Sequence, residues 1–158
     1  AYVDQLTGLA NRHAYSRYLE RLRNVDEGHP IAVLMVDVDH FKTVNDVHGH
    51  TVGDHVLRRL ADVLAEGARA TDLVARLGGD EFLVLLDAVD LPVAAGRAQN
   101  LLDRIAKASW TEIADDLTVS VSIGLAAGTA HAIDDLLEAA DSSLYQVKKS
   151  ERGTVRHA

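Results

Sequence analysis

Two glycines followed by two acidic residues, Gly78-Gly79-Asp80-Glu81, lie between the apolar segments 72–77 and 82–86. A Gly-Gly pair between strand-like segments predicts a hairpin turn, because tight turns need backbone angles that glycine adopts readily. The turn would present two carboxylates beside backbone that has no side chains. Such a site suits a metal ion such as Mg²⁺, which prefers carboxylate oxygens, and it lets a large anionic ligand approach closely.

Asp37 and Asp39 form a second acidic pair, directly after the apolar segment 31–36. Because they are two residues apart, they point to the same face if the strand continues through them. One interpretation is that they cap the helix that follows. The other is that they join the acids of the turn in chelating Mg²⁺, which binds together with substrate phosphates. The spacing alone leaves open whether the two acidic clusters meet.

Charged residues in three further segments have a structural interpretation, and two of these segments also have a ligand-binding one. Thr51-Val-Gly-Asp54 fits a capping box, but the Asp54 carboxylate also suits guanine, which offers two adjacent donors. Lys148 and Arg152 are four residues apart, so they either stabilise the end of a helix through its dipole or clamp phosphates. The segment 69–72 contains Arg69 and Asp72, which as a surface ion pair would contribute little to stability.

The composition excludes several classes of protein. The chain has 158 residues, of which 47% are hydrophobic and 25% charged, so one domain with a proper core is expected. It contains no cysteine, which excludes disulfides and zinc held by thiolates, and no apolar run is long enough for a membrane helix. The net charge of −8 disfavours nucleic acids and anionic membranes as partners. The P-loop and nucleophile-elbow motifs are absent.

Hydrophobic periodicity predicts a chain of alternating helices and strands. The expected strands are 31–36, 72–77, 82–86 and 117–127, and the expected helices are 12–25, 40–47, 51–68, 92–108 and 133–149. This order favours an α/β protein of the α+β type, with one mixed, largely antiparallel central sheet flanked by helices.

Six motifs occur in a characteristic order: residues 4–12, 36–46, 49–54, 76–82, 120–124 and 144–148. Together they resemble the GGDEF-domain diguanylate cyclase family over nearly the whole chain. The resemblance implies a core similar to class III nucleotidyl cyclases and polymerase palms. It also implies that residues 1–158 form a single catalytic domain that comes from a longer regulatory protein.

The resemblance implies a diguanylate cyclase that condenses two GTP molecules into cyclic di-GMP and releases two pyrophosphates. It implies a homodimer in the cytoplasm, controlled by an upstream sensor or regulatory domain, with no nucleic acid and no membrane as partner. Mg²⁺ (or Mn²⁺) would be held by Asp37, the Val38 carbonyl and Asp80. Glu81 would activate the attacking 3′-hydroxyl or bind a second metal ion.

By the same resemblance, Asn45 and Asp54 read guanine, and further nucleotide contacts come from Phe41, Lys42, Gly78, Gly79, Lys148 and Arg152. Arg69 and Asp72 match an Arg-x-x-Asp site through which cyclic di-GMP inhibits the enzyme. The chain departs from the family pattern at Glu151-Arg152-Gly153, where Gly-Arg-Asn is usual. It also departs near Asn100, where many members have an arginine that supports product binding. In this chain, Arg97 or Arg104 would take over the role of that arginine. The alternative is an inactive module that binds cyclic di-GMP or GTP as a regulatory receptor.

Overall fold

The computed structural model describes residues 1–158 and contains one five-stranded sheet with the strand order β2-β3-β1-β4-β5. The strands are β1 (Pro30–Val38), β2 (Leu73–Gly78), β3 (Glu81–Asp87), β4 (Val121–Thr129) and β5 (Val155–His157). Every neighbouring pair is antiparallel except β4 and β5, which are parallel. The predicted mixed, largely antiparallel sheet is therefore confirmed.

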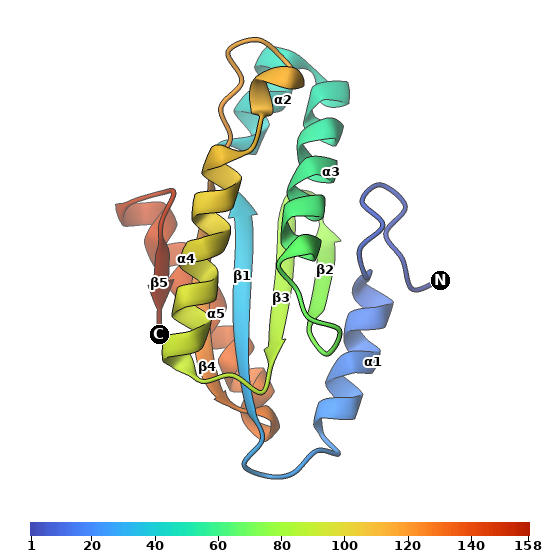
Figure 1. Cartoon of the computed structure of the whole chain (residues 1–158), viewed down its shortest axis with the longest axis vertical. Helices are drawn as coiled ribbons and strands as arrows, with labels where there is room; N and C mark the ends of the chain where they lie inside the picture. The colour runs from blue at the N-terminus through green and yellow to red at the C-terminus, as the bar shows by residue number, and fades with distance from the viewer.

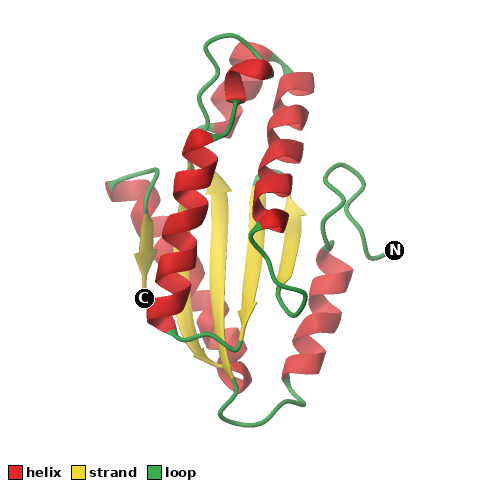
Figure 2. Cartoon of the chain, viewed as in Figure 1, coloured by secondary structure: helices red, strands yellow, loops and turns green.

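Five helices cover the two faces of this sheet, α1 (Arg12–Leu22), α2 (Phe41–His48), α3 (His50–Glu66), α4 (Leu91–Lys107) and α5 (Ile133–Ser150). Figure 1 shows α3 and α4 in front of the sheet and α5 behind it, with α1 beside β2. The colouring by secondary structure makes the layers plain (Figure 2). None of the helices is both long and apolar enough to cross a membrane.

The core consists of two apolar layers, one on each face of the sheet. In β1, the alternate residues Ala32, Leu34 and Val36 belong to the layer that α3 and α4 complete. Ile31 and Val33 belong to the layer that α1 and α5 complete. This alternation follows from the twofold period of a strand. It makes β1 a central strand that is packed on both faces and reaches the acidic residues at its end.

The structure differs from the sequence predictions mainly at the ends of elements. The first helix ends at Leu22 rather than at residue 25, and the fourth strand begins at Val121 rather than at residue 117. The strand β5 was not predicted, because three residues are too few for a recognisable hydrophobic pattern. The other helices and strands agree with the prediction to within three residues.

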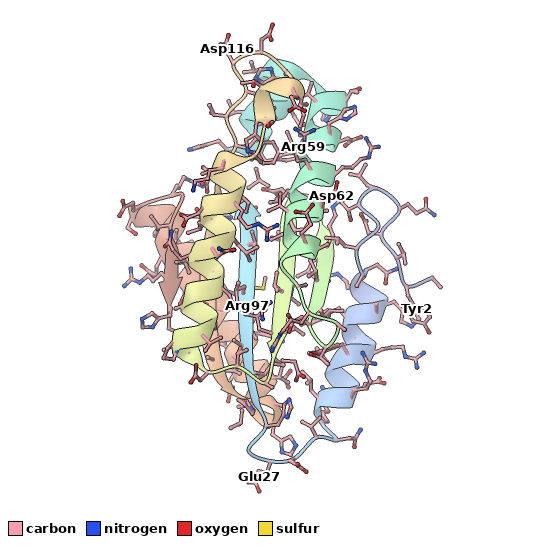
Figure 3. All side chains as sticks on the ribbon, in the orientation of Figure 1. Tyr2, Glu27, Arg59, Asp62, Arg97 and Asp116 are labelled. Carbon is pink, nitrogen blue, oxygen red and sulfur yellow. The ribbon has the colours of Figure 1, made fainter.

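Each edge of the sheet is formed by a short segment. Ala10 pairs with Ala75 of β2 through backbone hydrogen bonds to Val74 and Arg76, of 3.2 and 3.0 Å. On the other side, β5 lies along β4. Figure 3 shows the long axis of the molecule running from Asp116, near α2, to Glu27, before β1.

Candidate active site

The Gly-Gly segment forms the predicted turn between β2 and β3. Gly78 pairs with Glu81 across the hairpin, so Gly79 and Asp80 are the two loop residues. Gly79 has a φ of +53°, a left-handed conformation that glycine adopts without steric strain. Both glycines are exposed, and Glu81 is exposed beside them. The turn thus presents open backbone and a carboxylate to solvent.

Arg76 fastens this turn to the N-terminal segment. Its guanidinium donates two hydrogen bonds to the Gly79 carbonyl, of 3.0 and 2.8 Å, and contacts both oxygens of Asp4 at 3.2 Å. Asp4 also accepts hydrogen bonds from the backbone and hydroxyl of Thr7. Burial raises the pKa of Asp80 above its ordinary value, while its own backbone N–H and the charge of Arg76 act in the opposite direction.

The register of the sheet places Asp37 beside Glu81. Asp37, near the end of β1, pairs with Glu81 of β3 on one side and with Ser122 of β4 on the other. Directly paired residues of antiparallel strands point to the same face. The two acidic clusters therefore meet through Glu81, the second acid of the turn, on the face that α5 covers. Asp80 lies in the adjoining loop.

Lys148 of α5 contacts Asp37 from this face. Its ammonium is an ion-pair partner of Asp37 Oδ2, and the Asp37 side chain is buried. The other oxygen, Oδ1, is buried and has no hydrogen-bond partner. Burial, and secondly the charge of Arg152, lowers the pKa of Lys148 below its ordinary value. Asp37 thus has one oxygen against a cation and one oxygen available to a ligand.

Asp39 lies just beyond the end of β1 and has different partners. Its carboxylate accepts hydrogen bonds from Ser120 Oγ at 2.6 Å and Ser122 Oγ at 2.5 Å. Arg152 Nη1 is 3.9 Å from Asp39 Oδ1. Neither Asp37 nor Asp39 caps α2, because the N-cap residue is His40 and no side chain caps this helix. The capping interpretation of this pair is therefore wrong.

Residues of α2 and α3 form the other side of the candidate site. The Asn45 side chain faces Gly53, where an added β-carbon would overlap with Asn45 Oδ1. Asn45 Oδ1 is buried and has no hydrogen-bond partner. Asp54 is exposed, and the capping box is wrong, since α3 begins at His50 with no side-chain cap. Phe41 packs against the core, and Lys42 pairs with Asp46 at 3.2 Å.

The family described as diguanylate cyclase, GGDEF domain, matches residues 1–154. The chain belongs to this family of GGDEF-domain diguanylate cyclases. It is 37% identical to the response regulator PleD of Caulobacter vibrioides, over 98% of this chain and 36% of PleD. It is also 37% identical to the diguanylate cyclase DgcP of Pseudomonas aeruginosa, over 96% of this chain and 23% of DgcP. The chain thus spans well under half the length of either relative.

Solved structures agree with this assignment. The GGDEF domain of DgcB from Caulobacter crescentus, crystallised in complex with c-di-GMP, is 31% identical and superposes with a TM-score of 0.89. The match covers 99% of this chain and 95% of that one. The diguanylate cyclase SiaD of Pseudomonas aeruginosa, solved with its activator SiaC, has a TM-score of 0.88 over 100% of this chain and 62% of that one, at 31% identity. This GGDEF domain therefore has the nucleotidyl cyclase palm fold.

The residues at the end of β1 suit the divalent metal ion on which GGDEF diguanylate cyclases generally depend. Asp37 provides a buried oxygen without a partner, and the Lys148 ammonium shows that a cation is accommodated beside the second oxygen. Hard carboxylate oxygens are the ligands that Mg²⁺ prefers. No group of three or more acidic or histidine side chains is assembled here to hold a metal ion by itself. Mg²⁺ usually binds through one or two carboxylates plus substrate phosphates.

The Arg-x-x-Asp segment of this GGDEF domain lies at the opposite end of β2 from the turn. The Asp72 side chain has no exposed surface and accepts hydrogen bonds from the backbone of Arg69 and Asp87, at 2.8 and 2.9 Å. Arg97 of α4 donates to Asp72 at 2.8 Å and to the Gly67 carbonyl at 2.9 Å. Of the two arginines considered as replacements at Asn100, Arg97 reaches this segment, whereas Arg104 pairs with Glu66. Figure 3 shows Arg97 between the two ends of the long axis.

Sequence reasoning missed the individual contacts of Arg76, Ser120 and Ser122, although all three lie inside motifs that the resemblance identified. The available signal was the alternation of Ser120 and Ser122 with the apolar Val119 and Val121, which places both serines on one face. Nothing in the spacing of Arg76 indicated that it contacts Asp4, 72 residues earlier in the chain.

Proposed function

We propose that this domain is an active diguanylate cyclase, which joins two GTP molecules into cyclic di-GMP and releases two pyrophosphates. The observation that supports this best is the pairing of Asp37 with Glu81, beside the ammonium of Lys148. It provides neighbouring acidic and basic groups at the open end of a rigid strand. Phosphoryl transfer requires such a combination of acidic and basic groups.

Each half of the reaction is a substitution at phosphorus. The 3′-oxygen of one GTP forms a bond to the α-phosphorus of the other, the bond from that phosphorus to the bridging oxygen of pyrophosphate breaks, and the 3′-hydroxyl loses its proton. Two such steps close the cyclic dinucleotide. Glu81 is the exposed carboxylate beside Asp37, so it is placed to accept the proton.

The other residues of the site bind and orient the nucleotide. Lys148 and Arg152 would neutralise the charge that builds up on the phosphate oxygens. The open backbone of Gly78 and Gly79 would admit the triphosphate. Mg²⁺ (or Mn²⁺), held by Asp37, Asp80 and the Val38 carbonyl, would supply Lewis-acid polarisation of the phosphate when bound.

Guanine would lie against the junction of α2 and α3. The unpartnered Asn45 Oδ1 would accept a hydrogen bond from a base, and the exposed Asp54 carboxylate would accept from both N1–H and the amino group of guanine. Adenine has an acceptor at N1, so the same carboxylate would repel it. Phe41 and Lys42, at the start of α2, would complete the contacts to the nucleotide.

The reaction requires two copies of the domain, because each binds one GTP and the two must face one another in register. We propose that this homodimer acts in the cytoplasm, under the control of an upstream sensor domain in a longer protein. We also propose that cyclic di-GMP inhibits the enzyme by binding at Arg69 and Asp72. The buried Asp72, held by Arg97, supports the formation of an ordered basic site there for cyclic di-GMP.

The experiment is to incubate a dimerised form with GTP and Mg²⁺ and to resolve the products by chromatography. Cyclic di-GMP and pyrophosphate are expected in a ratio of one to two. A folded dimer that binds GTP but forms no cyclic dinucleotide would contradict catalysis and would favour the regulatory receptor. ATP that reacts as well as GTP would contradict the roles given to Asn45 and Asp54.

A further inference from the structure

Asp39 has no part in the chemistry proposed above, yet it is the more completely bonded of the two carboxylates at the end of β1. Its side chain is 3% exposed. Each of its oxygens accepts a hydrogen bond from a serine hydroxyl of the β4 segment, Ser120 to Oδ2 and Ser122 to Oδ1. A buried carboxylate requires such hydrogen bonds and a nearby positive charge, and the guanidinium of Arg152 supplies that charge.

The contrast with Asp37 separates the roles of the two acids. Asp37 has one oxygen without a partner and contacts one charged side chain, Lys148. Asp39 receives a hydroxyl on each oxygen, so it would have to break a hydrogen bond to bind an incoming ligand. Asp37 is therefore suited to ligand binding, and Asp39 is suited to holding its neighbours in place.

Asp39 is linked through Ser122 to the segment that follows α5. Ser122 Oγ, which donates to Asp39, accepts a hydrogen bond from the Gly153 backbone N–H at 3.2 Å. The next residue, Thr154, accepts a hydrogen bond from the backbone N–H of Ile123 at 3.0 Å, and its hydroxyl donates to the Glu151 carbonyl at 2.7 Å. The backbone is thus fixed on both sides of Arg152.

We propose that Asp39, together with Ser120 and Ser122, is a positioning residue that holds Arg152 against the end of β1, where its free N–H groups meet the triphosphate of the bound nucleotide. This proposal rests on the proposed function for the identity of that nucleotide. A guanidinium has five N–H donors in a planar fork. When one edge of the fork faces Asp39, the remaining N–H groups can bind phosphate oxygens. Fixing the side chain in advance reduces the entropy lost when the ligand binds.

The test is a double-mutant cycle on binding, measured by calorimetry with Mg²⁺ and a non-hydrolysable α,β-methylene analogue of GTP. Arg152→Ala and Asp39→Asn are each expected to weaken binding about tenfold, the size of one charge-assisted contact. If Asp39 acts through Arg152, the double variant also weakens binding about tenfold, because the second change removes nothing further. A roughly hundredfold loss in the double variant means that the two effects add and overturns the proposal.

Three controls separate positioning from a general loss of structure. Arg156→Ala, in the same segment but without an ion pair, is expected to bind as the wild type does. GMP is expected to bind equally to wild type and Asp39→Asn, because only the outer phosphates are affected, whereas an equal loss for GMP overturns the proposal. If Asp39→Asn fails to fold, Ser120→Ala replaces it and is expected to weaken binding. Ser120→Thr keeps the hydroxyl and is expected to bind as the wild type does. Equal binding by Ser120→Ala and Ser120→Thr overturns the proposal.

Inorganic triphosphate, tested in the same cycle, distinguishes failure of this proposal from failure of the proposed function. Non-additive losses for triphosphate, with no binding of the GTP analogue to the wild type, support the role of Asp39 and contradict the cyclase. Binding of the analogue with additive losses contradicts the role of Asp39 and leaves the cyclase standing. Binding of neither ligand contradicts both.

Discussion

Asp37 of β1 and Glu81 of β3 are direct antiparallel neighbours on one face of the sheet. Neighbouring side chains in such a pair start from β-carbons about 4.5–5.5 Å apart, so two negative charges at this separation repel one another. Lys148 offsets this repulsion by contacting Asp37. The acidic pair and its basic partner therefore form one electrostatic unit, and a change in any member should alter the behaviour of the others.

The first prediction concerns the two carboxylates. Asp37→Asn and Glu81→Gln are each expected to lower the rate of cyclic di-GMP formation by about 100-fold or more, since Asp37 is proposed to hold the metal ion and Glu81 to accept the proton. The measurement is the initial rate with GTP and Mg²⁺. Asp62→Asn, at an exposed position of α3, is the matched control and should keep the wild-type rate. Wild-type activity in Glu81→Gln would exclude Glu81 from proton transfer.

The second prediction concerns Lys148 in the absence of ligand. Lys148→Ala leaves the buried Asp37 without a counter-charge, so the free energy of unfolding should fall by about 1–3 kcal/mol in EDTA. Mg²⁺ should restore part of this loss, because a divalent ion can take the place of the ammonium. Urea unfolding of both proteins, with EDTA and with Mg²⁺, measures the effect. Lys149→Ala, at the exposed neighbouring position, should show neither the loss of stability nor its recovery with Mg²⁺. Equal stability of Lys148→Ala and wild type in EDTA would show that the ion pair is not stabilising.

The third prediction uses two glycines inside helices. Gly53→Ala should displace Asn45, whose Oδ1 occupies the space of the new β-carbon, and so weaken binding of the GTP analogue by about tenfold, the loss of one hydrogen bond to the base. Gly96→Ala, in α4, meets nothing within 4 Å and should raise stability by about 0.5–1 kcal/mol through helix propensity alone. Calorimetry and thermal unfolding test the pair. Unchanged binding in Gly53→Ala would remove Asn45 from guanine recognition.

The fourth prediction is a pH dependence of stability that comes from Asp72. Burial alone would raise the pKa of Asp72, but hydrogen bonds from the Arg69 backbone, Arg97 and the Asp87 backbone outweigh it and hold the pKa below the ordinary 3.8. Below pH 3.8, Asp72 becomes protonated in the unfolded chain before it does so in the folded chain. The stabilisation of the fold by ionised Asp72 is therefore complete above pH 3.8 and disappears as the pH falls through the lower pKa of the folded state.

Asp72→Asn should therefore be less stable than wild type at pH 7, by about 1–3 kcal/mol, and should lose less stability between pH 7 and pH 3. Urea unfolding across this range measures both quantities. Asp141→Asn, at an exposed position of α5, is the control. Parallel pH profiles for Asp72→Asn and wild type would assign the acid sensitivity to other groups, of which Asp4 is the first, since its pKa is also held low.

The sequence predicted the order of the elements well, because long helices and buried strands leave strong periodic patterns. The apolar residues 31–36 and the Gly-Gly turn were sufficient to predict β1 and the hairpin of β2 and β3. The strand β5 was missed because its pairing with β4 depends on a long-range contact and not on its own composition. The two capping interpretations were wrong because α2 and α3 begin without side-chain caps.

The site was predicted in its residues more than in its geometry. The expectation that the two acidic clusters meet depends on register, which no spacing along the chain reveals. The register joins Asp37 to Glu81, while Asp80 occupies the loop. The link from Arg97 to Asp72 could be considered from the sequence only as one of two possible replacements at Asn100. The structure distinguishes them by distance, since Arg97 donates to Asp72 and Arg104 does not.

The short segments at the two edges of the sheet limit how two copies of this domain can associate. Ala10 takes two of the outward backbone hydrogen bonds of β2, and the edge strand β5 offers only three residues to an incoming chain. An exposed strand of full length would invite edge-to-edge pairing and aggregation. Continuous sheets across two molecules are therefore disfavoured at these edges, and a homodimer of the proposed kind would have to associate through side-chain surfaces instead.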